Sequence, residues 1–147
     1  FLNPYTGFAV ARMELPNLKT AGMVLSTSDG GLTWKILSAG SLPGLNGIKF
    51  FDEKNGIVYG DGSDGSPTGI FRTVDGGANW RVVPGTRSPT WYGGDFTDAE
   101  TGVLVGAWGR IAPYRNSRFA AADVDTLGGR TIRQVKLVGD RAYAAGN

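Results

Sequence analysis

The residues of this sequence that suit acid–base or metal chemistry are carboxylates, because the chain contains neither histidine nor cysteine. Those absences remove the commonest general base, the commonest transition-metal ligand and the thiol nucleophile. Residues 61–66 read DGSDGS, and this alternation of carboxylates and hydroxyls with glycines resembles a calcium loop with Asp61 and Asp64 as ligands. It lacks the closing glutamate of an EF-hand, so an ordinary polar turn between two strands is the favoured interpretation.

A second set of candidates suits binding rather than catalysis. One group of arginines with a tyrosine is dense enough to hold an acidic partner, since Arg pairs bidentately with carboxylates and Tyr adds contact area. The alternative is a solvated loop with local ion pairs. The members of this group are Arg110, Tyr114, Arg115 and Arg118.

Three aromatic residues, Trp91, Tyr92 and Trp108, lie in segments that link predicted strands. They would stack on a sugar or cover a peptide if these links reach a ligand-binding face. Packing in the core is the favoured alternative, because large aromatic side chains are usually buried.

An internal repeat organises the chain that must position these residues. The segment TSDGGLTW at residues 27–34 recurs as TVDGGANW at residues 73–80, an offset of 46 positions. Phe50, Asp52 and Gly56 recur at the same offset as Phe96, Asp98 and Gly102. Two motifs that share one period predict a repeated structural unit.

Each unit is predicted to be a four-stranded antiparallel sheet of the size of a propeller blade. In the best copy the strands are expected near residues 47–51, 57–59, 69–73 and 80–83, with the apolar second strand buried on both faces. The same template predicts strands at 1–2, 7–11, 23–26 and 34–37, then 102–105 and 111–113, then 132–138 and 142–145. The sequence therefore predicts an all-β propeller of about three and a half blades, over residues 1–38, 45–84, 91–124 and 131–147.

A chain that holds only part of a ring is expected to be completed by other blades. Blades bury their faces against one another, and a propeller needs roughly four to eight of them. We expect the chain to be a fragment of a longer ring of six to eight blades. The alternative is that a second chain completes the ring.

The repeated segment resembles the Asp-box, or BNR, motif S/T-x-D-x-G-x-T/S-W. The matching residues are Thr27, Asp29, Gly31, Thr33, Trp34, Thr73, Asp75, Gly77 and Trp80. The resemblance implies a structural hairpin between the third and fourth strands of a blade, with the Asp bonded to turn N–H groups and the Trp wedged between sheets. Residues 114–119 are interpreted as an eroded third box, with Asn116 in place of Asp and Phe119 in place of Trp.

Among Asp-box propellers, the rhythm of this chain is most similar to the photosystem II assembly and stability factors. That resemblance implies a non-enzymatic scaffold that binds a protein client and needs no cofactor, in a protein exported to a periplasmic, extracellular or lumen-like compartment. The resemblance to sialidases is more distant, since the arginine, tyrosine and glutamate set of those enzymes is not assembled here. The alternative function is a glycoside hydrolase, sialidase-like or an Asp-box glucanase, using two of Asp61, Asp64 and Asp95 on a carbohydrate substrate.

Composition agrees with an all-β chain and excludes some partners. The 24 glycines accompany 4 Trp, 5 Tyr and 7 Phe, which favours short strands and tight turns over disorder. A net charge of +2 gives no indication of a nucleic-acid partner. No apolar run approaches the roughly 18 residues of a membrane span.

Overall fold

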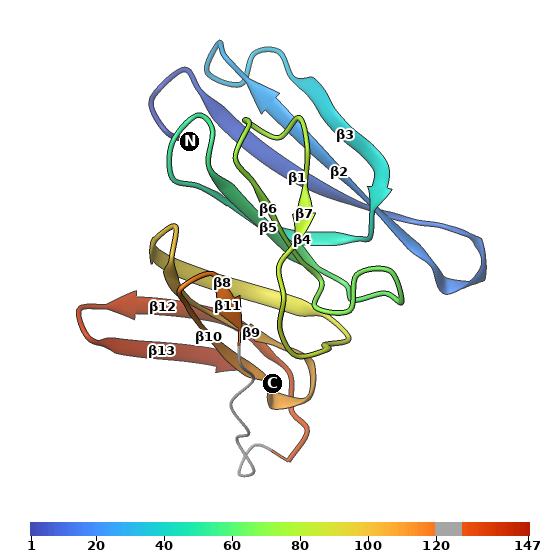
Figure 1. The fold of residues 1–147 in the computed structure, drawn as a ribbon, viewed down its shortest axis with the longest axis vertical. Coiled ribbons are helices and arrows are strands. Elements are labelled where there is room, and N and C mark those ends of the chain that lie inside the picture. Colours follow the sequence, from blue (N-terminus) through green and yellow to red (C-terminus); the bar gives the residue numbers. More distant parts are fainter. Residues whose placement is uncertain (120–127) are drawn as a thin grey trace.

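The computed structural model of the chain describes residues 1–119 and 128–147. This part of the chain consists of strands and turns, with two short 3-10 turns, η1 (Pro16–Leu18) and η2 (Ala107–Gly109) (Figure 1). None of the described helical segments has the length and apolarity needed to cross a bilayer. The strands are β1 (Gly7–Glu14), β2 (Thr20–Thr27), β3 (Lys35–Leu42), β4 (Leu45–Phe50), β5 (Gly56–Gly60), β6 (Ile70–Thr73), β7 (Arg81–Val82), β8 (Trp91–Asp98), β9 (Thr101–Gly106), β10 (Ile111–Arg115), β11 (Arg118–Phe119), β12 (Ile132–Val138) and β13 (Arg141–Gly146).

The described strands form four antiparallel sheets, each made of strands that follow one another in sequence. Sheet 1 is β1-β2-β3, sheet 2 is β4-β5-β6-β7, sheet 3 is β8-β9-β10-β11, and sheet 4 is β12-β13. Consecutive pairing of this kind needs only short turns, which is why glycine is so frequent in the sequence. Figure 1 shows sheets 1 and 2 in the upper half of the view and sheets 3 and 4 below them.

The first strands of successive sheets lie against one another. β1 contacts β4, β4 contacts β8, and β8 contacts β12; we call β4, β8 and β12 the inner strands. Glycine permits this approach at Gly93, where a Cβ would lie 2.6 Å from the carbonyl oxygen of Arg133. A side chain at that position would push β8 and β12 apart.

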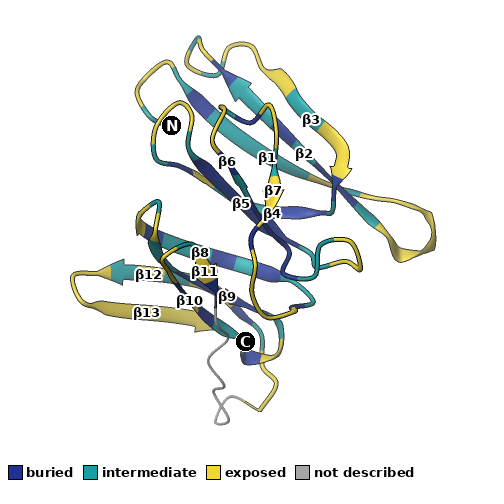
Figure 2. Ribbon diagram, in the orientation of Figure 1, coloured by how far each residue is buried: buried dark blue, intermediate teal, exposed yellow. Residues whose placement is uncertain are grey.

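Two apolar clusters hold adjacent sheets together, and Figure 2 shows the buried strands in dark blue. The cluster between sheets 1 and 2 contains Val24, Leu42, Leu45, Val58 and Phe71. The larger cluster between sheets 2 and 3 contains Ile57, Tyr59, Ile70, Val83, Trp91, Phe96, Leu104, Ala112, Tyr114 and Phe119. Because alternate side chains of a strand point to opposite faces, β5 supplies both clusters and is buried on both faces, as the sequence predicts.

The recurring Phe, Asp and Gly form a turn between the first two strands of a sheet. The Asp52 Oδ1 accepts hydrogen bonds from the backbone N–H groups of Lys54 and Asn55, at 2.8 and 2.7 Å. The ring of Phe50 covers Gly56, where a Cβ would lie 2.8 Å from ring carbons. Phe96, Asp98 and Gly102 repeat this arrangement in sheet 3, which confirms that the second motif is structural.

The predicted strand positions agree with the structure in sheets 2 and 4 and depart from it in sheets 1 and 3. In sheet 3 the predicted link that holds Trp91 and Tyr92 is part of a strand, β8. Phe1 and Leu2 lie outside any strand, so the described part of sheet 1 has three strands, and its last strand extends to Leu42 rather than residue 37. Residues 120–124 of the predicted third blade lie outside the described residues.

The predicted third box at residues 114–119 is wrong. Asn116 and Ser117 both have left-handed backbones, with φ of 52° and 62°, and Arg115 pairs directly with Arg118. Residues 115–118 therefore form a two-residue hairpin, whose turn matches the twist of its strands. This hairpin is too short to adopt the longer turn that residues 73–80 form in sheet 2.

Candidate functional site

A groove runs along the inner strands and is the best candidate for a binding site. It consists of two adjoining hollows of about 540 and 570 Å³ that share Tyr92, Arg133, Gln134 and Ala145. A volume of this order suits a peptide segment or a small ligand. We call it the inner-strand groove; the other lining residues are Asn46, Tyr59, Gly93, Gly94, Val135, Lys136, Tyr143, Ala144, Gly146 and Asn147.

Arg133 is held in a fixed position in this groove. Its guanidinium carbon lies 5.3 Å from the centre of the Tyr92 ring, and its Nε donates a 3.0 Å hydrogen bond to the Asn147 Oδ1. Among residues 1–119 and 128–147, no carboxylate forms an ion pair with Arg133. Stacking and one neutral hydrogen bond therefore orient a cation whose other N–H groups have no acceptor in the part of the chain that the structure describes.

The wall of the groove is formed by Tyr59 and by a second cation. Burial raises the pKa of Tyr59 to about 12, so its hydroxyl is neutral at physiological pH. Lys136 lies 3.6 Å from Asp95, and the same Asp95 oxygen accepts a 2.7 Å hydrogen bond from the Leu137 N–H. Asp95 is thus engaged in holding β12 against β8, and it is not free to act on a substrate.

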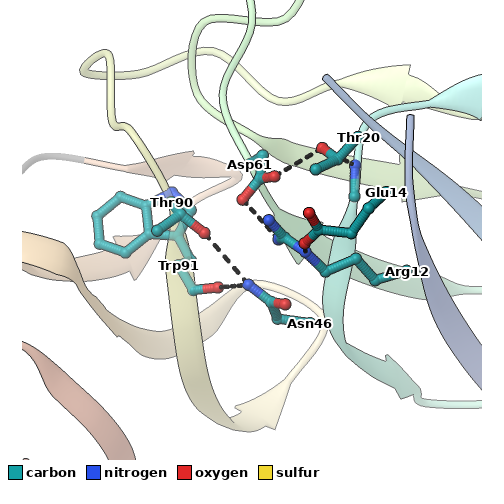
Figure 3. Close-up of polar contacts among 8 residues, drawn as sticks. Arg12, Glu14, Thr20, Asn46, Asp61, Thr90 and Trp91 are labelled. Atoms are coloured by element: carbon teal, nitrogen blue, oxygen red, sulfur yellow. Dashed lines mark hydrogen bonds and ion pairs between the residues drawn. The ribbon is translucent and has the colours of Figure 1, made fainter. Parts of the chain in front are cut away.

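Asp61 ties sheets 1, 2 and 3 together at one end of the inner strands (Figure 3). It accepts a 2.9 Å hydrogen bond from the Arg12 guanidinium and a 2.7 Å hydrogen bond from the Thr20 hydroxyl, both in sheet 1. Thr90, next to sheet 3, pairs with Asp61 in an isolated antiparallel bridge, and its hydroxyl accepts a 3.2 Å hydrogen bond from the Asn46 amide. We call Arg12, Thr20, Asp61 and Thr90 the clasp.

The clasp explains the ionisation of Asp61. Burial alone raises the pKa of a carboxyl, but the hydrogen bonds from Thr20 and Arg12, together with the nearby Thr90 hydroxyl, outweigh it, so the pKa of Asp61 is lowered. Arg12 is also 3.6 Å from Glu14, and its own pKa is raised by Asp61. Asp61 is therefore an ionised, fully engaged side chain, whereas a glycosidase acid needs a raised pKa.

The second carboxylate of the predicted calcium loop lies apart from the clasp. Asp64 has a side chain that is 98% exposed and pairs with Arg87 at 2.8 Å. That pair lowers the pKa of Asp64. Within the described ranges, no three carboxylates gather closely enough to hold a metal ion. Residues 61–66 lie in the link between β5 and β6.

The two repeated hairpins have the same internal hydrogen bonds. Asp29 Oδ1 accepts from the Thr27 hydroxyl and the Thr33 N–H, at 2.8 and 2.9 Å; Asp75 does the same with Thr73 and Asn79. Hydrogen bonds from the residue four positions on, Thr33 and Asn79, lower the pKa of both carboxyls to about 2. Gly31 and Gly77 have φ of 94° and 91°, which a side chain would strain.

The tryptophans of the two hairpins differ in burial. Trp80 packs on the cluster between sheets 1 and 2 and meets Phe50 edge to face. Trp34 is 40% exposed and contacts Phe1, and its Nε1 donates to the Gly31 carbonyl at 3.1 Å. The expected wedge is found at Trp80 but not at Trp34, because no described sheet covers the outer face of β2 and β3.

The predicted arginine and aromatic candidates do not form one surface. Trp91 and Tyr114 are buried in the cluster between sheets 2 and 3, so the favoured interpretation of Trp91 as a core residue is confirmed and the partner contact considered for Tyr114 is wrong. Arg115 and Arg118 are exposed beside the two-residue hairpin, whereas Arg110 donates to the Arg87 carbonyl beyond the other end of β10. Tyr92 alone of this set lies in the inner-strand groove.

Sequence reasoning missed Arg133, Lys136 and Tyr59 as groove residues. Arg133 and Lys136 lie in β12, and no motif marks them. A signal was present for Tyr59, since glycines at positions 47 and 94 of β4 and β8 both leave room for its ring. A Cβ at Gly47 would lie 2.1 Å from the Tyr59 ring.

The comparisons with known proteins agree with this architecture. A scan against models of protein families finds no match, and a search of curated proteins finds none either. Among solved structures, the chain is similar to that of "YCF48 bound to D1 peptide", with a TM-score of 0.59 and 15% sequence identity. The match covers 100% of this chain and 59% of that one, so the chain spans well under two thirds of its length. At this identity the likeness shows the fold alone: the chain is part of a β-propeller.

Proposed function

We propose that this protein is a non-catalytic binding scaffold whose inner-strand groove holds a segment of a protein client. The observation that carries the proposal is Arg133, which is oriented by Tyr92 and Asn147 and has no carboxylate partner among the described residues. A cation fixed in this way is prepared for a polar group of a ligand, and Tyr92 beside it offers apolar contact area.

Two further observations favour binding over catalysis. Asp61 and Asp64 are held ionised by cations and hydrogen bonds, and Asp95 is engaged with β12. Neither Asp61 nor Asp64 supplies the protonated acid that glycoside hydrolysis requires. The similar structure of YCF48 contains a bound D1 peptide, which supports a peptide as the kind of ligand. A role of the assembly-factor type is part of this proposal, and the export expected from the family resemblance stays a prediction.

Site-specific photo-cross-linking in the source cell tests the proposal. A benzophenone amino acid in place of Tyr92 samples the groove, and the same residue in place of Tyr5, which is exposed and outside the groove, is the matched control. We expect a discrete protein adduct from position 92 and none from position 5. Equal adducts from both positions, or glycan without protein at position 92, would contradict the proposal.

A turnover assay separates the glycosidase alternative. The protein is incubated with a panel of glycosides, alongside the Asp61→Asn, Asp64→Asn and Asp95→Asn variants. We expect no hydrolysis by any of them. Hydrolysis by the unmodified protein that disappears in one variant would replace the scaffold proposal with catalysis.

A further inference from the structure

The hairpin of β1 and β2 ends in a tip that reaches beyond the neighbouring sheets. Figure 1 shows it extending to the right of the view, and Figure 2 shows the tip as exposed. Residues 15–19 form the tip, closed by a 2.8 Å hydrogen bond from the Leu15 N–H to the Lys19 carbonyl. The tip carries two leucines, and the side chain of Leu18 is 98% exposed.

The backbone of the tip makes Leu18 an unexpected residue. Asn17 and Leu18 both have left-handed conformations, with φ of 66° and 58°. Asn tolerates this region, but a bulky side chain is disfavoured there. A turn selected for stability alone would carry Gly, Asn or Asp at position 18, so an exposed leucine in a strained conformation indicates a role outside the fold.

The base of the hairpin is rigid. Arg12 near the end of β1 and Thr20 at the start of β2 both bond to Asp61 of the second blade, and the Gly44 N–H donates to the Thr20 hydroxyl at 2.9 Å. The clasp therefore fixes both strands just below the tip. An apolar side chain on a rigid support loses little entropy when it binds.

A second turn also exposes a large apolar side chain on a residue with a left-handed backbone. In η2, Trp108 has φ of 59° and is 67% exposed. This turn is fixed by a hydrogen bond from the Ala107 N–H to the Thr90 carbonyl, and Thr90 belongs to the clasp. Two links attached to the clasp thus display a large apolar side chain on a left-handed residue.

We propose that the β1–β2 tip inserts Leu18 into an apolar pocket of the protein client, with Trp108 as a second contact. This inference rests on the proposed function and adds a contact outside the groove. The charges around the tip are of both signs: Lys19 lies in the tip, Glu14 beside it pairs with Arg12, and Asp64 on the neighbouring link pairs with Arg87, so the described residues form no cationic patch to face an anionic lipid surface. Mixed charges around an apolar apex fit a protein surface instead.

The test compares Leu18→Asn with Leu32→Asn. Leu32 is 87% exposed in the β2–β3 turn at the other end of the same sheet, which makes it a matched control. The client is the protein recovered by the cross-link at position 92, purified and measured by biolayer interferometry. We expect Leu18→Asn to weaken its binding about tenfold to a hundredfold, the value of burying one leucine, and Leu32→Asn to change it less than about twofold. The melting temperature of Leu18→Asn should equal or exceed that of the unmodified protein, because Asn suits the left-handed backbone.

The outcomes distinguish the two proposals. Absence of a client at position 92 removes the proposed function and this inference with it. A client that binds Leu18→Asn as tightly as the unmodified protein overturns the inference and leaves the groove proposal intact. Binding to vesicles of phosphatidylcholine and phosphatidylglycerol that is lost in Leu18→Asn would replace the protein pocket with a lipid surface.

Discussion

Replacing Asp61 by Asn should destabilise the protein far more than replacing Asp64 by Asn. Both carboxylates lie in the link between β5 and β6, and each accepts a short hydrogen bond from an arginine, at 2.9 Å for Asp61 and 2.8 Å for Asp64. They differ in exposure. The Asp61 side chain is 17% exposed, whereas that of Asp64 is 98% exposed.

The magnitudes follow from that difference. Hydrogen bonds to a charged group contribute about 1.5 to 3 kcal/mol each, and breaking a fully buried ion pair costs about 3 to 5 kcal/mol. Arg12 is partly exposed and Asn keeps one acceptor oxygen, so we expect a loss of about 2 to 3 kcal/mol for Asp61→Asn. An exposed ion pair is weak because solvent screens it, so Asp64→Asn should leave the free energy of unfolding almost unchanged.

Urea denaturation followed by tryptophan fluorescence measures both values. Because the folded pKa of Asp61 lies below its ordinary value of 3.8, the stability that its carboxylate contributes is present above that pH and is lost as the pH falls through the folded pKa. The difference in the free energy of unfolding between the unmodified protein and Asp61→Asn should therefore become smaller below about pH 4. Equal losses of unfolding free energy in Asp61→Asn and Asp64→Asn would refute the role assigned to the clasp. A stability difference between Asp61→Asn and the unmodified protein that does not change with pH would refute it too.

The remaining predictions concern the cores and the hairpins. Trp91→Ala should cost about 3 to 5 kcal/mol in urea denaturation, because Trp91 is buried and donates to the Thr68 carbonyl, whereas Trp34→Ala should cost under about 2 kcal/mol; similar values for both would contradict the burial difference. The Tyr114 hydroxyl is buried without a hydrogen-bond partner among the described residues, so Tyr114→Phe should leave stability unchanged or raise it by about 1 kcal/mol; a loss above about 1 kcal/mol would reveal a bond to that hydroxyl. Asp29 and Asp75 have folded pKa values of about 2 against 3.8, so their stabilisation is present above about pH 4 and is lost towards pH 2; Asp29→Asn and Asp75→Asn should flatten an acid titration monitored by circular dichroism, and an unchanged titration would count against these hydrogen bonds.

Local patterns in the sequence predicted most of the strand positions. β5 was recognisable because an apolar run between two glycines fits a strand buried on both faces, and β12 because its turn at residues 139–140 follows an apolar run. The repeated Phe, Asp and Gly marked the turn before the second strand. The same turn at the start of the chain escaped notice, because Asn3 replaces Asp there. Asn3 Oδ1 accepts from the Tyr5 and Thr6 N–H groups in the equivalent way.

The site was beyond sequence reasoning for a geometric reason. Tyr114 and Arg115 are neighbours in the sequence, yet adjacent residues of a strand point to opposite faces, so one is buried and the other exposed. A dense sequence cluster therefore cannot form one surface on a strand. Tyr92 and Arg133, which do lie together, belong to different blades and are brought together by packing at Gly93.

Hydrogen–deuterium exchange of the protein with and without its cross-linked client tests the central claim most directly. Binding in the inner-strand groove should slow exchange in β8 and β12, which carry Tyr92 and Arg133, and leave β3 at the outer edge of the first blade unchanged. Protection confined to β3 or to the repeated hairpins, with β8 and β12 unaffected, would contradict the claim.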